Sequence, residues 1–502
     1  MTHSEVWRGG RRALLHVLAC GLLASCEIGA EPRRSEPLGP ARTAPSLAPA
    51  PVLPLAPARA VVATPEASPV RPRVMPDRPE RTQALQALAE KLGAPGARVE
   101  DPCVAPAGGG CARTALSPFF ESLDALAAGT ASGPTVIEAF GNSLIAGDRI
   151  VNILREDLGA AFGSAGRGVL LVDRMAPYGG RDRTGYSRGG WEPRTLGELR
   201  APPLPFGITG VYHVATQARA HSRFKLEGES RGTLWWLDVP KAGALTVSSG
   251  GQVLARTEPG GTGEARTTTF ELPEGAKAVD VVAEGKGAVV QGVVLQHDKP
   301  GVILDMLGVP SADAGLYARM DDATLRAHLA ERGPKLLLFF LGGNESKRIE
   351  WKRLTMEKLR TDLQALLRRA RAAAPGSACM LVGPMDAVQD ARGKKDRFSQ
   401  RPYLEAVIAA EREVALAEGC AFFDTFTAMG GKGALARFHA AGFMHDDLVH
   451  PKGRGLDLLG HFVTDALLRA WVETPGAGRV ATLTPEADVP APKPAGTAEA
   501  VP

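Results

Sequence analysis

The chain has 502 residues, of which 44% are hydrophobic, and its formal net charge is +4. This apolar content excludes a wholly disordered chain, and beyond the N-terminus no run of 18 apolar residues indicates a membrane-spanning helix. No basic tract is dense enough to indicate nucleic-acid binding. Prolines crowd at both ends, with 13 of the 39 between residues 32 and 79 and six between residues 474 and 502. Both stretches are therefore predicted to lack packed structure.

The N-terminus has the pattern of an export signal. Three arginines precede an apolar stretch of about twelve residues, which is too short to span a bilayer. It ends in Leu-Ala-Ser-Cys at residues 23–26, which resembles a bacterial lipobox, where the signal is cut before the cysteine and the cysteine is lipidated. Residues 1–25 are thus predicted to be a lipoprotein signal peptide; the alternative is an ordinary signal peptide with an incidental Cys26. The lipoprotein reading implies an exported bacterial protein of the cell envelope, anchored to a membrane through Cys26.

Four cysteines remain beyond Cys26. Cys103 and Cys111 enclose a short Gly-rich loop, and in an exported protein this spacing favours a disulfide. A metal site is not expected there, because no His or second Cys pair lies nearby. Cys379 and Cys420 each lie at the edge of an apolar, strand-like run, where a buried free cysteine and a second bridge remain equal alternatives.

The chain divides into segments of different periodicity. Residues 26–79 are rich in Pro, Ala and Arg without periodicity, which predicts a semi-extended tether. Residues 80–204 and 298–473 alternate apolar runs with amphipathic helical stretches. Residues 205–297 show period-two alternation between Gly-rich turns, which predicts an all-β module. Residues 474–502 are predicted to be a disordered tail.

The two α/β segments are predicted to form one domain, interrupted by the β module. Strands separated by helices indicate a parallel sheet with helices on both faces. The predicted strands are 135–140, 168–173, 301–306, 335–341, 379–382 and 421–424, and the main predicted helices are 117–128, 148–162, 322–332, 353–373, 403–418 and 455–472.

Three short blocks carry candidate chemistry, because each follows a predicted strand or precedes a helix, where open α/β sheets gather their catalytic groups. The first is Gly-Asn-Ser-Leu at residues 141–144. A serine at a strand-to-helix turn is exposed enough to be a nucleophile, although Ser143 alone is more typical of a helix N-cap. The second is Gly-Gly-Asn-Glu at residues 342–345. The amide of Asn344 could donate to a developing oxyanion, although the block alone is typical of a plain turn.

The third block is Asp447-Leu-Val-His450, followed by proline and a helix. A carboxylate three residues before a histidine can fix its tautomer and stabilise the imidazolium, as a serine nucleophile requires of its base. The alternative is a helix-capping Asp447 beside an unrelated histidine. His445 is a lesser rival for the base.

In their order and spacing, the three blocks resemble those of the SGNH (GDSL) hydrolase superfamily, over about residues 115–200 and 298–473. The resemblance implies a flavodoxin-like sheet and a catalytic triad of Ser143, Asp447 and His450. It also implies an oxyanion hole from the Ser143 amide, Asn344 and a further backbone amide. Ser311, in the run Asp-Met-Leu-Gly-Val-Pro-Ser-Ala at 305–312, matches the glycine that supplies this last donor; Gly166 and Gly168 are alternatives. Two positions depart from the family pattern, since Asn142 and Glu345 each replace an aspartate, but neither belongs to the triad.

The run at 305–312, the Gly-Gly-Asn-Glu block and the inserted module resemble the peptidoglycan and polysaccharide O-acetylesterases of this superfamily, in which a carbohydrate-binding-like, jelly-roll β domain is inserted. The resemblance implies a monomeric serine esterase that removes O-acetyl groups from an acetylated cell-wall or extracellular glycan, without cofactor, metal or nucleic acid. An O-acetyltransferase with the same triad and a non-catalytic glycan-binding lipoprotein are the alternatives. In the module, Tyr212, Trp235 and Trp236 could stack on sugar rings, although aromatics in a small β module more often form its core.

Overall fold

The computed structural model describes residues 73–107, 110–174, 185–198, 203–389 and 396–474, together with the two residues 481–482. The predicted signal peptide, Cys26 and most of the predicted tether and tail lie outside the described residues. Within the described ranges, no helix has both the length and the apolar character needed to cross a membrane.

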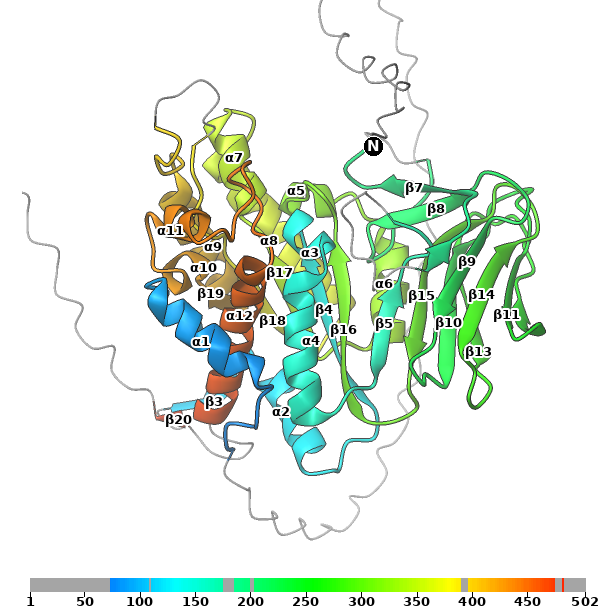
Figure 1. Cartoon of the computed structure of the whole chain (residues 1–502), viewed down its shortest axis with the longest axis horizontal. Coiled ribbons are helices and arrows are strands. Elements are labelled where there is room, and N and C mark those ends of the chain that lie inside the picture. The colour runs from blue at the N-terminus through cyan, green and yellow to red at the C-terminus, as the bar shows by residue number, and fades with distance from the viewer. Residues whose placement is uncertain are drawn as a thin grey trace, which may run out of the picture. The chain divides into compact units, whose positions relative to one another are not determined.

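A six-stranded sheet forms the centre of the α/β domain (Figure 1). Its strands, from edge to edge, are β1 (Val99–Glu100), β19 (Ala421–Phe423), β18 (Ala378–Val382), β17 (Leu336–Phe340), β4 (Pro134–Gly141) and β16 (Gly301–Gly308). The five strands from β19 to β16 are parallel, and β1 pairs antiparallel with β19. Numbered in chain order, the parallel strands follow the order 2-1-3-4-5, which is the flavodoxin-like arrangement. The predicted fold class is therefore confirmed.

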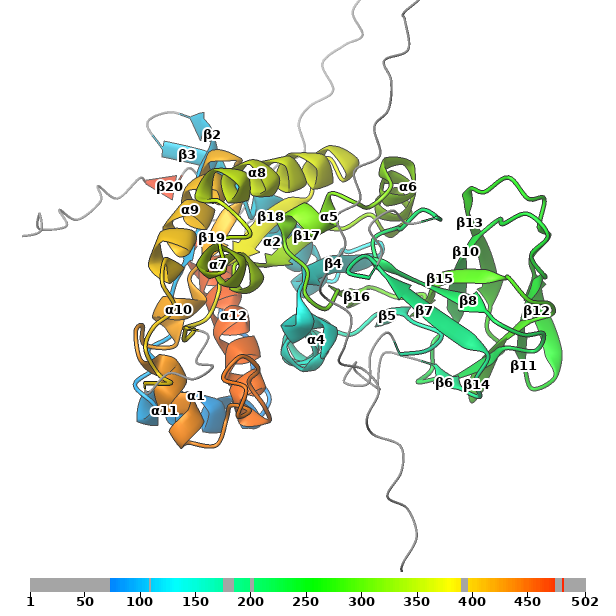
Figure 2. The same ribbon diagram turned by 90° about the horizontal axis from the view of Figure 1, so that it is seen from above.

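Helices cover both faces of this sheet (Figure 2). One layer holds α1 (Arg81–Lys91), α2 (Ser117–Ala127), α4 (Arg149–Phe162) and α12 (Arg454–Glu473); the other holds α5 (Ala314–Tyr317), α6 (Asp322–Arg332), α8 (Met356–Ala373) and α9 (Leu404–Ala417). Successive side chains of a strand point to opposite faces. In β17, Leu336 and Leu338 therefore join the first layer, while Leu337 and Phe339 join the second. This two-sided burial explains why β17 is a continuous apolar run.

The β module consists of two antiparallel sheets that share one core. The first sheet has the order β13 (Ala265–Glu271), β10 (Arg231–Leu237), β15 (Val289–Gln296), β8 (Val211–Ala215) and β7 (Trp191–Thr195), with β5 (Gly166–Leu170) also paired to β15; the second has β12 (Gln252–Arg256), β11 (Leu245–Ser249), β14 (Ala278–Ala283), β9 (His221–Lys225) and β6 (Tyr186–Ser187). Three strands, β5, β6 and β7, thus lie before residue 205, the boundary predicted from the sequence. Their brevity hides any periodicity, and the run at 168–173 was predicted to belong to the α/β domain, whereas β5 pairs with β15.

The three aromatic side chains considered for sugar stacking are packed inside the molecule instead. Tyr212, Trp235 and Trp236 are all buried. Trp235 stacks on His328 of α6, with ring centroids 4.2 Å apart, and its Nε1 donates to Glu331 Oε2 at 2.5 Å. These residues therefore pack the module and tie it to the α/β domain rather than forming a sugar platform.

A buried ionic cluster lies beside this contact. Asp305 of β16 accepts Arg332 Nε on one carboxylate oxygen and the Val169 amide on the other, both at 2.8 Å. Gly168 has φ 74°, and a Cβ there would lie 1.9 Å from Asp305 Oδ1, so the close approach requires glycine. Gly166 and Gly168, the alternative oxyanion donors, therefore serve β5 and its contacts. Neither residue lines the cavity described below.

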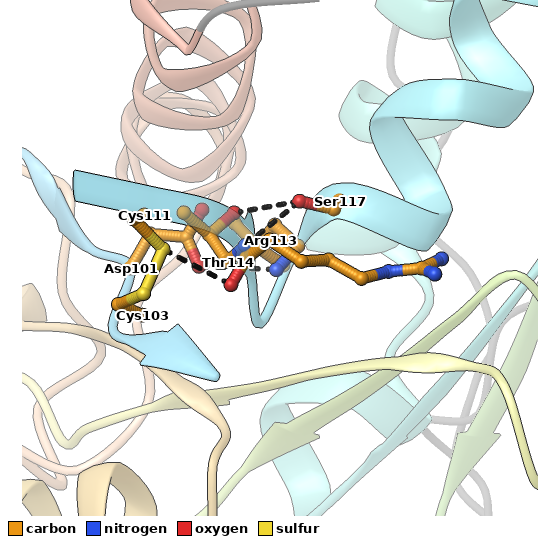
Figure 3. Close-up of a disulfide and its surroundings, with 7 residues drawn as sticks. Asp101, Cys103, Cys111, Arg113, Thr114 and Ser117 are labelled. Atoms are coloured by element: carbon orange, nitrogen blue, oxygen red, sulfur yellow. Dashed lines mark hydrogen bonds between the residues drawn. A yellow bond between two sulfur atoms is a disulfide. The ribbon is translucent and has the colours of Figure 1, made fainter. Parts of the chain in front are cut away.

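The described residues contain two disulfides. Cys103 of β2 (Cys103–Ala107) is bonded to Cys111 of β3 (Gly110–Thr114), close to Asp101 (Figure 3). Asp101 accepts the Leu116 amide, and burial raises its pKa to about 6. The second disulfide joins Cys379 and Cys420, which decides the alternatives that the sequence left open. It links β18 to the residue before β19, its neighbour in the sheet.

Short parts of both predicted disordered ends are ordered. Arg73, in the predicted tether, makes a bidentate ion pair with Asp124, and Arg78 binds Asp157 at 2.8 Å. Residues Ala481–Thr482, in the predicted tail, form strand β20 beside β3. Proline-rich composition could not reveal these contacts, because each joins the end to a segment far away in sequence.

Candidate active site

A cavity of about 220 Å³ opens at the carboxyl ends of the parallel strands, the upper edge of the sheet in Figure 1. Short helices follow three of these strands: α3 (Ser143–Ala146) after β4, α7 (Gly343–Glu350) after β17 and α10 (Thr425–Ala428) after β19. The cavity is lined by residues from all three short helices, by the turn after β16, by the loop after β18 and by the loop before α12. In this strand order β4 and β17 adjoin the topological switch point, where α/β sheets bind ligands.

Ser143, His450 and Asp447 form a continuous hydrogen-bonded chain at this cavity. Ser143 Oγ lies 3.0 Å from His450 Nε2, and His450 Nδ1 lies 2.7 Å from Asp447 Oδ2. These distances fit a neutral imidazole that donates from Nδ1 to the carboxylate and accepts the serine hydroxyl on Nε2. The fold thus brings together Ser143 and His450, which lie more than 300 residues apart in the sequence.

Asp447 is held as an anion by more than its histidine. Its Oδ1 accepts the backbone amides of Val449 at 2.9 Å and His450 at 3.0 Å. Burial would raise its pKa, but the hydrogen bonds from the His450 side chain and from these two amides outweigh burial and lower the pKa below its ordinary value. His445, the rival base, is exposed, and it does not line the cavity.

The turn that presents Ser143 is tightly packed. Gly141 ends β4, and a Cβ there would lie 2.4 Å from Ile145 Cγ1, so only glycine fits. The buried Tyr317 hydroxyl donates to the Gly141 carbonyl at 2.6 Å and accepts the Gly141 amide at 2.9 Å. Asn142 caps α3 by accepting the Leu144 amide, a role that the family aspartate would fill equally well. Ser143 itself is the first residue of α3, so its amide has no intrahelical acceptor.

The proposed oxyanion donors Asn344 and Ser311 line the same cavity as Ser143. Asn344 Nδ2 donates to the Ala312 carbonyl at 2.7 Å, which fixes the amide plane. Because the amide nitrogen carries two hydrogens, this bond leaves a second one for the cavity. Ser311 has φ 63°, a left-handed conformation that favours glycine. This backbone supports its match to the family's glycine block.

Two buried residues that the sequence analysis did not single out for this role brace the Asn344 loop. Glu345 accepts the amides of Gly342 at 2.9 Å and Ala314 at 3.1 Å, so it joins the turn before α7 to the start of α5. Arg401 donates from its Nη1 to the Gly343 carbonyl and to Ser346 Oγ. The sequence could have pointed to Glu345, because it lies directly beside Asn344. It could not have pointed to Arg401, because Arg401 follows a segment without periodicity.

Comparison with known proteins supports the same assignment. Residues 282–458 match the GDSL-like Lipase/Acylhydrolase family. This match includes Asn344, Asp447 and His450 but not Ser143, which lies ahead of the β module. The placement of Ser143 therefore rests on its geometry. No curated protein matches the chain.

Solved structures resemble this chain to different degrees, and the first of them shows the same fold. A structure described as "Peptidoglycan O-acetylesterase in action" is 19% identical, with a TM-score of 0.61 over 71% of this chain and 97% of that chain. A lipase/acylhydrolase from Enterococcus faecalis is 17% identical over 34% and 77% of the two chains, with a TM-score of 0.26. A carbohydrate-binding module of Cellvibrio mixtus lichenase 5A, in complex with cellotriose, is 13% identical over 22% and 90%, with a TM-score of 0.17. From the family match and the first of these structures, the chain resembles the SGNH/GDSL hydrolases in sequence and has their fold, so hydrolysis of an ester bond is the reaction class that its site supports.

Proposed function

We propose that the protein is a serine esterase that removes O-acyl groups, in the first place O-acetyl groups, from a cell-wall or extracellular carbohydrate. The observation that carries this proposal is the chain of contacts from Ser143 Oγ through His450 to Asp447, with Ser143 and His450 facing a cavity of about 220 Å³. A cavity of this size suits a small acyl group better than a long lipid chain.

The geometry supports acyl transfer in two steps. His450 Nε2 takes the Ser143 proton as Oγ attacks the ester carbonyl, and Asp447 stabilises the imidazolium. In this mechanism the Ser143 and Ser311 amides and the Asn344 side chain donate to the tetrahedral oxyanion. His450 then gives the proton to the departing sugar oxygen, which leaves an acyl-serine. Water, deprotonated by His450, attacks this ester and releases the carboxylic acid and free Ser143.

The carbohydrate substrate is supported by the O-acetylesterase named among the similar structures, since the match covers 97% of that chain. Acetate release from acetylated peptidoglycan and acetylated xylan, measured side by side, tests it. Ser143→Ala should lower kcat by about 10⁶-fold on any ester, because a serine triad works as a unit. Substantial turnover by a folded Ser143→Ala protein would refute the nucleophile. No acetate release from either glycan by an active wild-type enzyme would refute the carbohydrate substrate.

The proposal also includes attachment to a membrane through a lipid on Cys26, which the lipobox-like residues 23–26 support. Metabolic labelling with a palmitate analogue should mark the protein, and Cys26→Ala should abolish the label. A labelled Cys26→Ala protein would overturn this part of the proposal and leave the esterase untouched.

A further inference from the structure

Two glutamates lie behind the loop that carries Asn344. Glu345 belongs to α7 and Glu411 to α9, and their exposed fractions are only 2% and 1%. Both approach Gly342, the residue before α7. Glu345 Oε2 accepts the Gly342 amide, while a Cβ on Gly342 would lie 2.5 and 2.8 Å from the two carboxyl oxygens of Glu411. Two carboxyl groups therefore flank the backbone of the oxyanion loop on its buried side.

Nothing nearby in the described structure neutralises this pair. A small void of about 10 Å³ borders both glutamates together with Asp313 at the start of α5 and Asp362 of α8. The adjacent cations are already committed, since Arg348 pairs with Asp313 and Lys358 pairs with Asp362. Arg401, which braces the same loop, pairs with Glu350. Oε2 of Glu411 is buried without a hydrogen-bond partner among the described residues. Two adjacent buried carboxylates with no cation would be very costly, so one of the two must carry a proton.

We propose that Glu345 and Glu411 hold a single negative charge between them, with the proton on Glu411, and that this arrangement positions the Asn344 loop for catalysis. The assignment rests on the proposed esterase function, and it makes Glu411 a positioning residue that does not touch the substrate. The proton belongs on Glu411 because Glu345 accepts two backbone amides, which favour its charged form.

The pKa directions agree with this geometry. Burial raises the pKa of Glu345 to about 7, against the opposing effect of its backbone hydrogen bonds. Burial, and then the charge of Glu345, raise the pKa of Glu411 well above its ordinary value. At neutral pH the pair therefore keeps its last proton. In alkaline solution this proton leaves, and the two carboxylates repel each other across Gly342. The loop should then shift, and Asn344 should lose its alignment with the oxyanion.

The pH dependence of kcat tests this assignment on p-nitrophenyl acetate. In the wild type, kcat should fall on the alkaline side by about 100-fold, the usual cost of losing one oxyanion donor. Glu411→Gln keeps the shape of the side chain without its charge, so its kcat should stay within about twofold over the same range. Glu411→Met is a second uncharged variant, in case the amide prevents folding. Asp101→Asn is the matched control, because it removes another carboxyl of raised pKa far from the site, and it should keep the alkaline fall.

The proposal would be overturned if a folded Glu411→Gln or Glu411→Met enzyme lost activity in alkali as the wild type does. It would also be overturned if Asp101→Asn abolished the fall equally. An infrared difference spectrum detects the protonated carboxyl directly and does not depend on enzyme activity. The wild type minus Glu411→Gln should contain the C=O band of a protonated carboxyl at neutral pH, and its absence would refute the shared proton. A wild type with this band but without esterase activity would refute the proposed function alone.

Discussion

A carboxylate is paired with a nitrogen-containing side chain both at the cavity and at the junction with the β module. The first pair is partly exposed, and the second is buried. In the cavity, the side chains of Asp447 and His450 make a 2.7 Å contact and are still 48% and 42% exposed. At the junction, Asp305 and Arg332 make a 2.8 Å contact, and their side chains are 0% and 4% exposed. Asp305 also accepts one backbone amide, and Asp447 accepts two.

The difference shows that pairing alone does not identify a catalytic group. An imidazole that opens on a cavity can exchange its proton with a substrate, whereas Arg332 and Asp305 can reach none. At the junction the charges instead stabilise the fold, because removing one partner of a buried ion pair leaves the other charge unpaired and destabilises the protein. Asp447 should therefore matter for rate and little for stability, while Arg332 should matter for stability and little for rate.

Among the variants that separate these two sites, Asp447→Asn is expected to have the largest effect. Asparagine can still accept the backbone amides, but its NH₂ group would face His450 Nδ1 and favour the wrong tautomer. We expect kcat on p-nitrophenyl acetate to fall by about 10⁴-fold, with an unfolding midpoint close to the wild type. Asp446→Asn is the matched control, because the Asp446 side chain is 98% exposed and should leave kcat unchanged. Equal losses in both variants would remove the distinction between Asp447 and its neighbour.

The second prediction is the reverse case at the junction. Arg332→Met should destabilise the protein by about 3–5 kcal/mol, because it leaves Asp305 and the buried Glu138 without their cation. Urea unfolding measures this loss, while kcat of the folded variant should stay near the wild type. Arg326→Met, on the exposed side of the same helix, should change stability by less than about 0.5 kcal/mol. A stable Arg332→Met protein would mean that the cluster does not tie the module down.

The sequence was sufficient for the α/β fold, because each strand of the parallel sheet is a short apolar run followed by a helix. The strands β17 and β18, buried on both faces, were predicted within two residues at either end. The β module was predicted from period-two alternation, but β6 and β7 were not predicted, and the strand predicted at 168–173, which overlaps β5, was assigned to the α/β domain. Their pairing partners lie at least 16 residues away, and more than 120 residues away for β5, so nothing local marks them as part of the module.

The site was predictable where spacing within a block carries the chemistry. Asp447 and His450 are three residues apart, and the turn alone brings them together. Ser143 and Asn344 could be placed at strand ends, but their convergence depends on β4 and β17 being neighbours in the sheet. Tyr317, Arg401 and Glu411 could not be found this way. Tyr317 and Arg401 act through buried hydrogen bonds with backbone atoms of other elements, and Glu411 through its position beside Gly342. Such contacts leave no periodic pattern in the sequence.

The smallest predicted effect concerns His328, which stacks on Trp235 at the same junction. Burial lowers its pKa to about 3, so the folded protein keeps the imidazole neutral. The unfolded chain binds a proton on His328 below pH 6.5, whereas the folded protein does not. The protein therefore keeps its full stability above that pH and loses part of it as the pH falls toward 3. The loss should be about 1.4 kcal/mol per pH unit.

His328→Phe keeps the stacking without the titration, so the amount by which its free energy of unfolding exceeds that of the wild type should grow by about 2–3 kcal/mol between pH 7 and pH 4.5. Urea unfolding at both pH values measures this difference, and His445→Gln, which removes an exposed imidazole, should show no such growth. A constant gap between wild type and His328→Phe would mean that the acid sensitivity of the junction comes from other groups, such as the buried His213, whose pKa burial lowers to about 4.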